Sequence, residues 1–216
     1  MAVNVVFHGY DHSLIEDAIH GHPQLFRGGL VIDPLVSPEA AASNVARIYS
    51  RDFTSVRFKG NLWPGPGRLG IKDTVGQAVV RVAGDREMSV AVLSEFVDEP
   101  GQAEEIESLC RDFPRTPVLV DHFGGNGGPT SFSGDGWQRL LALSRFDNAH
   151  VKVTGWHPHG IAASGDATLQ LISSLPPVRI THGSAYKVLR LVSLLSWAID
   201  RRDQYMTCSP FPAPPS

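Results

Sequence analysis

Short apolar runs alternate with amphipathic stretches along most of the chain, and most runs end at a polar residue or a glycine. The runs are mostly continuously apolar, which is typical of parallel strands that are buried on both faces. Seven strands are predicted, at Asn4–Phe7, Gly29–Ile32, Ser55–Phe58, Ser89–Leu93, Val118–Val120, His150–Val153 and Val178–Thr181.

Each predicted strand is followed by a stretch with helical periodicity. Asp11 and His12 are expected to start the first helix, and Ser37-Pro38-Glu39 opens the second with a cap residue, a proline and an acid near the positive end of the helix. The predicted helices are Ser13–His20, the segment after Ser37, Val75–Val82, Ala103–Arg111, Trp137–Ser144, Ala167–Ser174 and Ala185–Ile199.

Alternating strands and helices predict a parallel sheet, either open and doubly wound or closed into a barrel. The glycine-rich run at 124–128 comes late and does not open a helix, as a dinucleotide-binding turn would, and no P-loop is present. We therefore expect an α/β fold of the (β/α)₈ TIM-barrel type. Seven units are one short of closure, so the first strand is expected to be missing before Val3. The barrel is expected over residues 1–200, with a disordered proline-rich tail over residues 201–216.

Composition and charge indicate which kinds of binding partner the protein has. The 216 residues carry a formal net charge of -3, which argues against a nucleic-acid partner. The apolar run Val188–Ile199 is shorter than the roughly 20 residues that a membrane-spanning helix needs. Two cysteines, Cys110 and Cys208, do not make a disulfide framework and favour a reducing, cytoplasmic location. A small-molecule substrate is the expected partner.

Catalytic groups of such barrels follow the carboxyl ends of the strands. Arg57 and Lys59 alternate along one strand and point to the same side, where two cations suit an anionic or carbonyl substrate; contact with helix carboxylates is the alternative. The strand-end candidates are His8, Asp33, Lys59 with Asn61, Ser94 with Glu95, Asp121 with His122, Thr154 with His157 and His159, and Thr181 with His182.

Asp121-His122 gives the sharpest prediction, because a histidine can act as a general base and a buried aspartate can orient it. A capped strand end with a surface histidine is the alternative. His8 is either a rim residue that binds substrate or a loop histidine near the terminus. The spacing of His157 and His159 resembles a metal pair, but zinc needs further ligands fixed in space, so no metal ligands are predicted from the residues.

Four segments resemble the amidohydrolase-related ("amidohydrolase 2") family: Phe26–Pro34, Ser55–Pro64, Val118–Gly124 and Leu143–Gly155. Their order and spacing agree from about Val5 to Gly155. The resemblance is to a plant and cyanobacterial branch and, beyond it, to dicarboxylate and sugar lactonases. It implies a TIM barrel, hydrolysis of a lactone or a similar bond, His122 as the base or electrophile, and a substrate-lining segment that contains Arg57 and Asn61.

The same resemblance implies a divalent, zinc-like metal, for which the ligand set is incomplete here. The family carries a His-x-His pair on its first strand, which would precede this chain. Ser94-Glu95 stands where a fifth-strand histidine ligand is expected, and Ala185 stands where the family has an aspartate. The two ends therefore look truncated.

The sequence is compatible with two functions. The first is a hydrolase of a small, anionic lactone or ester, with His122 and Asp121 catalytic and Arg57, Lys59, Asn61 and His8 binding substrate. The second is a catalytically inactive, truncated barrel that serves as an interaction remnant, in which open sheet edges could pair into a homo-oligomer. A nucleotide-dependent enzyme is disfavoured.

Overall fold

The computed structural model describes residues 2–3, 9–49, 52–63, 68–94, 99–125, 134–153 and 180–182. Seven strands form one sheet in which every pairing is parallel. They are β1 (Ala2–Val3), β2 (Gly28–Val31), β3 (Phe53–Lys59), β4 (Ser89–Leu93), β5 (Val118–Val120), β6 (Ala149–Val153) and β7 (Ile180–His182).

The strand order is the chain order, β1 to β7. A doubly wound sheet reverses direction at a switch point, whereas a barrel adds each strand beside the previous one, so the expected α/β-barrel type is confirmed. Within the described residues, no ladder joins β7 back to β1. Oligomerisation through the sheet edges stays a prediction.

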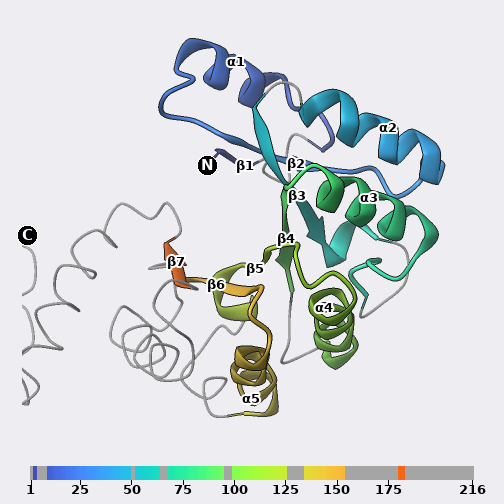
Figure 1. Cartoon of the computed structure of the whole chain (residues 1–216), viewed down its shortest axis with the longest axis vertical. Helices are drawn as coiled ribbons and strands as arrows, with labels where there is room; N and C mark the ends of the chain where they lie inside the picture. Colours follow the sequence, from blue (N-terminus) through green and yellow to red (C-terminus); the bar gives the residue numbers. More distant parts are fainter. Residues whose placement is uncertain are drawn as a thin grey trace, which may run out of the picture.

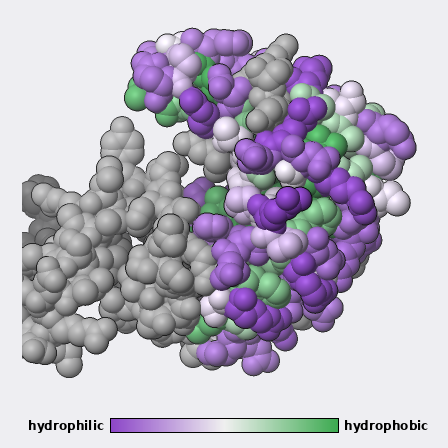
Figure 2. Space-filling view, viewed as in Figure 1, coloured by the Kyte–Doolittle hydropathy of each residue, from purple (hydrophilic) through white to green (hydrophobic). Residues whose placement is uncertain are grey.

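Helices follow the strands in chain order around the outer side of the sheet (Figure 1). The outward surface over these helices is mostly hydrophilic (Figure 2). None of the helices that the structure describes is both long enough and apolar enough to cross a membrane. The helices are α1 (Ser13–Gly21), α2 (Pro38–Tyr49), α3 (Thr74–Asp85), α4 (Pro100–Asp112) and α5 (Asp135–Ala142), with short 3₁₀ turns η2 (Gly60–Leu62), η3 (His122–Gly125) and η5 (Leu143–Arg145).

Most predicted elements agree with the structure to within a few residues. The strand expected at Asn4–Phe7, the helices expected at Ala167–Ser174 and Ala185–Ile199, and the tail over residues 201–216 lie outside the described residues. Ser37 caps α2 as expected, with its hydroxyl accepting a hydrogen bond from the Ala40 amide at 3.2 Å.

Asp11 and His12 start α1, as expected: His12 is its N-cap residue and its carbonyl accepts from the Glu16 amide at 2.9 Å. The side chain of His12 makes no capping hydrogen bond, whereas that of Asp11 accepts from the Ser13 amide at 2.9 Å. The Nε2 atom of His12 accepts a hydrogen bond from the Val31 amide of β2, also at 2.9 Å, in a buried position. The imidazole thus satisfies a backbone donor of the strand, a tertiary contact that local sequence does not reveal.

Side chains alternate between the two faces of the sheet. Val56 and Phe58 of β3, Val92 of β4 and Val120 of β5 belong to the hydrophobic core, together with Leu109 of α4. The intervening positions of the strands therefore face the other, inner side. That side carries Arg57, Lys59, Asp121 and Lys152.

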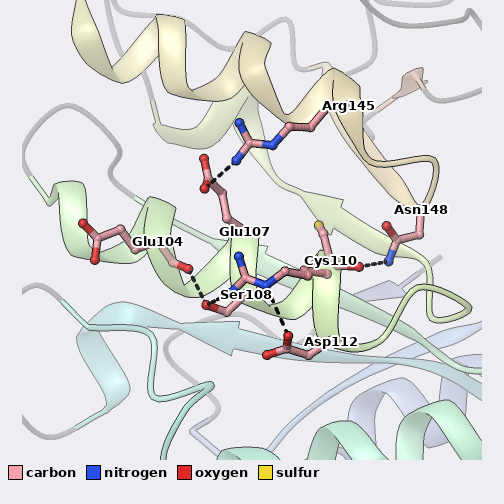
Figure 3. A network of polar contacts seen from close by, with 8 residues as sticks. Glu104, Glu107, Ser108, Cys110, Asp112, Arg145 and Asn148 are labelled. Atoms are coloured by element: carbon pink, nitrogen blue, oxygen red, sulfur yellow. Dashed lines mark hydrogen bonds and ion pairs between the residues drawn. The ribbon is translucent and has the colours of Figure 1, made fainter.

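A second polar cluster joins α4 to the segment after α5 on the outer side (Figure 3). Asn148 donates hydrogen bonds from Nδ2 to the carbonyls of Cys110, Phe113 and Thr116, at 3.2, 3.0 and 3.0 Å. Arg145 pairs with Glu107 of α4 at 2.7 Å. We call this cluster the α4 bracket; it satisfies a carbonyl in the last turn of α4, that of Cys110, and the carbonyls of Phe113 and Thr116 in the segment that follows.

Candidate active site

Asp121 follows β5 directly and is the centre of a cluster at the carboxyl ends of the strands. Its side chain is 1% exposed. The Oδ2 atom accepts from Arg57 Nε at 2.7 Å and lies 2.5 Å from a second guanidinium nitrogen. The ammonium of Lys152 lies 3.4 Å from Oδ1. One carboxylate thus joins side chains from β3 and β6, two strands that are not neighbours in the sheet.

Lys59 adds a third cationic side chain to this cluster. It lies two residues beyond Arg57 on the same face of β3 and is 1% exposed. Burial lowers the pKa of Lys59, the charge of Arg57 lowers it further, and Asp121 opposes both. We call Arg57, Lys59, Asp121 and Lys152 the rim cluster; it has three cationic side chains and one carboxylate.

His122 follows Asp121 and opens η3. Its backbone has a φ of 53°, in the left-handed region that few non-glycine residues adopt. Such conformations are costly and occur often at functional sites. Burial lowers the pKa of His122; Asp121 raises it, and Lys152 and Arg57 lower it. The lowered pKa favours the neutral imidazole, the form that a general base needs.

Three buried polar atoms at these strand ends have no hydrogen-bond partner among the described residues: Ser94 Oγ, Asp121 Oδ1 and His122 Nδ1. Most buried polar side-chain atoms in proteins are hydrogen-bonded, so each exception calls for an explanation. Of the three, Asp121 and His122 are close enough to Arg57 and Lys152 for the charges of these cations to act on them.

The structure brings together four of the residues expected from the sequence: Arg57, Lys59, Asp121 and His122. Arg57 contacts a strand-end aspartate, and not a helix carboxylate. Asp121 accepts from Arg57 and pairs with Lys152; within the described part of the chain, no hydrogen bond joins it to His122, although its charge raises the histidine pKa. Its observed contacts thus hold two cations, and its expected role in orienting the imidazole stays a prediction.

Other expected residues are placed differently or not described. Asp33 accepts from the Leu35 amide at 2.9 Å in a local turn. Asn61 lies in η2 directly after β3, but its side chain is not among those described. His8, Glu95, His157 and His159 lie outside the described residues.

Lys152 was missed as a site residue, although the sequence carries a signal for it. It stands between Val151 and Val153 in an apolar strand, and a lysine at such a position faces away from the core. The link to Asp121, 31 positions earlier, required the fold.

Comparison with known proteins agrees with this architecture. The family model described as "Amidohydrolase" matches residues 2–210. Among proteins with curated functions, none matches the sequence.

Several solved structures are similar. A probable 2-pyrone-4,6-dicarboxylic acid hydrolase from Acinetobacter baumannii, with citric acid bound, has a TM-score of 0.69 and 17% identity over 89% of this chain and 69% of its own. A candidate hydrolase of the same acid from Pseudomonas putida has a TM-score of 0.68 and 18% identity over 87% of this chain and 66% of its own.

An amidohydrolase from Burkholderia multivorans with bound zinc has a TM-score of 0.52 and 13% identity, over 86% of this chain and 81% of its own. At these identities the likeness shows the fold alone. The chain spans about two thirds of the length of the Acinetobacter and Pseudomonas proteins.

Proposed function

Because the chain belongs to the amidohydrolase family, we propose that it hydrolyses a small, anionic lactone or ester at the carboxyl ends of its strands. The observation that carries this proposal is the rim cluster: the buried carboxylate of Asp121 holds Arg57 and Lys152, Lys59 lies on the same face of β3, and His122 is the next residue after Asp121. Attack of water on a lactone carbonyl is helped by a base that takes the proton of the water, and cationic side chains attract the carboxylate of an anionic substrate.

Arg57, Lys59 and Lys152 bind the carboxylate of the substrate. Asp121 pairs with Arg57 and Lys152, and the rim cluster itself contains three cationic side chains and one carboxylate. The low exposure of Arg57 and Lys152, 10% and 13%, strengthens their attraction for an anion, because little water screens it. A pyrone dicarboxylic acid, the compound in the names of two similar structures, is a lactone with this kind of charge.

His122 acts as the general base. The neutral imidazole takes a proton from water as the water oxygen attacks the carbonyl carbon, and the ring C–O bond then breaks. The departing oxygen takes the proton back from the imidazolium, which leaves a hydroxy acid and a neutral histidine. A histidine base without a metal can catalyse hydrolysis of an activated lactone, but not of a stable amide.

A divalent metal is found in one similar amidohydrolase, which holds zinc. The residues that the structure describes contain no group of three or more histidine, cysteine, aspartate or glutamate side chains able to hold one. The carboxylate of Asp121 is occupied by two cationic side chains, and three cations nearby would repel a metal ion. The described rim does not fit a metal, and no step of the proposed reaction uses one.

The test is turnover on a panel of small lactones, with and without a carboxylate. We expect hydrolysis of the carboxylated members, and His122→Ala should lower kcat by at least about 100-fold, as loss of a general base does. His20→Ala, at an exposed position in α1, is the matched control and should keep full activity. A protein that binds carboxylated lactones without hydrolysing any would instead support a non-catalytic binding module.

A further inference from the structure

The main-chain segment 68–71, which leads from β3 towards α3, is held by a buried carboxylate of α4. Glu105 is 6% exposed. Its Oε1 atom accepts a hydrogen bond from the Leu69 amide at 2.9 Å, and Oε2 accepts one from the Ile71 amide at 2.8 Å. Gly70, between these amides, has a φ of 74°, and amides around such a left-handed residue form concave anion sites. Glu105 fills this site and ties the segment to α4.

The held segment packs directly against the residue that follows Lys59. A Cβ atom added to Gly60 would lie only 3.2 Å from the carbonyl oxygen of Arg68, at the start of the segment. The same atom would lie 2.7 Å from the side-chain nitrogen of Gln102, which precedes Glu105 by about one turn of α4. The first residue beyond Lys59 therefore lies in close contact with both the segment and α4.

The segment also supports the residue that precedes Lys59. The ring of Trp63 stacks on that of Phe58, with 5.3 Å between the ring centroids. A Cβ atom added to Gly70 would lie 2.0 Å from the Trp63 ring, so the segment packs against that ring as well. Lys59 thus stands between two residues, Phe58 and Gly60, whose surroundings depend on where the segment lies.

We propose that Glu105 is a positioning residue: by holding the segment 68–71, it keeps Lys59 in the rim cluster, where the charge of Lys59 attracts the carboxylate of the substrate. This inference rests on the proposed function, in which the rim cluster binds that carboxylate. Arg57 and Lys152 are held by Asp121 instead. Loss of the Glu105 carboxylate should therefore displace Lys59 and leave the other two cations in place.

The test measures the dissociation constants of 4-oxocyclohexane-1-carboxylate, a cyclic ketone acid that cannot be hydrolysed, and of cyclohexanone, its uncharged reference. Glu105→Gln keeps the shape of the side chain but has only one oxygen, so one of the two amides loses its acceptor. We expect the carboxylate to bind about 5-fold more weakly, because one of three cations is displaced, and cyclohexanone to bind with unchanged affinity.

A double-mutant cycle shows whether the effect passes through Lys59. In a Lys59→Met background, Glu105→Gln should change the affinity for the carboxylate by less than about twofold, because the side chain that it positions is gone. In a Lys152→Met background, the loss of about 5-fold should persist, since Asp121 holds Lys152 independently of α4. A merely structural role of Glu105 would give the same loss in both backgrounds.

Glu107→Gln is the matched control. It makes the same substitution on the same helix and removes the carboxylate that pairs with Arg145 at 2.7 Å in the α4 bracket. Its affinity for both ligands should remain that of the wild type.

Gln77→Leu loosens the same segment by a different route, and it carries the test if Glu105→Gln does not fold. The Gln77 side chain donates to the Ile71 carbonyl at 2.9 Å, and its removal should also weaken binding of the carboxylate but not of cyclohexanone. This loss, too, should disappear in the Lys59→Met background.

The outcomes separate this inference from the proposed function. Equal carboxylate affinity of Glu105→Gln and wild type, or the same loss in the Lys59→Met and Lys152→Met backgrounds, would overturn the role of Glu105 and leave the proposed function intact. A wild type that binds the carboxylate no better than cyclohexanone would reject the anion-binding rim and the role of Glu105 with it. Selective binding of the carboxylate without turnover of any lactone would keep the positioning role and reject the hydrolase.

Discussion

The rim cluster and the α4 bracket are both polar groups on the same sheet-and-helix framework, yet they differ in how completely their atoms are paired. In the bracket, one Asn148 amide donates to three carbonyls, of which Figure 3 draws that of Cys110, and Arg145 pairs with Glu107 (Figure 3). At the strand ends, Ser94, Asp121 and His122 each bury an atom that has no hydrogen-bond partner in the described structure.

The difference is between a polar cluster that is complete in itself and strand ends that leave polar atoms for a ligand to pair. A satisfied cluster holds elements together and gains nothing from a ligand, whereas an unsatisfied one lowers stability until a ligand completes it. The cysteine of the bracket agrees with a structural role: burial and the nearby Glu107 raise the pKa of Cys110 to about 12, so its thiol is unreactive near neutral pH. The strand ends, in contrast, combine the charges of the rim cluster with buried polar atoms that have no hydrogen-bond partner in the described structure.

Asp121→Asn should have the largest effect, because it removes the charge that holds Arg57 and Lys152. Breaking one side of a buried ion pair costs about 3–5 kcal/mol, so the free energy of unfolding should fall markedly in urea titration. Hydrolysis should fall with it, since two cations lose their common partner. A variant with unchanged stability would show that this carboxylate does not hold the cluster together.

Asn148→Ala should have a smaller effect and one confined to stability. Three carbonyls near the end of α4 lose their donor, and buried polar groups left without partners cost about 1–3 kcal/mol. Urea unfolding should show this loss, whereas KM should stay the same. Asp147→Ala, at the exposed neighbouring position, is the control. A changed KM would mean that the two clusters are coupled.

Substitution of His12 should have the smallest effect, a change in how the stability of the protein depends on pH. Burial lowers the pKa of His12, so below about pH 6.5 the unfolded chain binds a proton that the folded chain does not. Stability should therefore decrease as the pH falls from 7 through this window and until the lowered folded-state pKa is passed.

A glutamine at position 12 can still accept from the Val31 amide, but it cannot titrate. Melting temperatures of His12→Gln should therefore fall less between pH 7 and pH 5 than those of the wild type. His122, whose pKa is also lowered, contributes equally to both proteins, and His20→Gln serves as the exposed control. Parallel pH profiles for wild type and His12→Gln would contradict the role assigned to His12.

Sequence patterns predicted the parallel sheet and the placement of Arg57 and Lys59 on one face of a strand, because strand periodicity assigns side chains to faces; whether that face was the inner or the outer one was left open. They also located Asp121 and His122 at a strand end. Periodicity cannot tell which residues of different strands meet, so the pairing of Asp121 with Arg57 and Lys152 was not predicted. The interaction of His12 with β2 was missed for the same reason: its partner is 19 positions away.

The central claim is that the strand ends hold cations in order to bind an anionic substrate. The most direct measurement is the dissociation constant of 4-oxocyclohexane-1-carboxylate, and of cyclohexanone as the uncharged reference, for wild type, Lys152→Met and the exposed-site control Lys72→Met. A hydrogen bond to a charged group contributes about 1.5–3 kcal/mol, so Lys152→Met should bind the carboxylate at least about 10-fold more weakly and bind cyclohexanone unchanged. Equal affinity of Lys152→Met and wild type for the carboxylate would contradict the account.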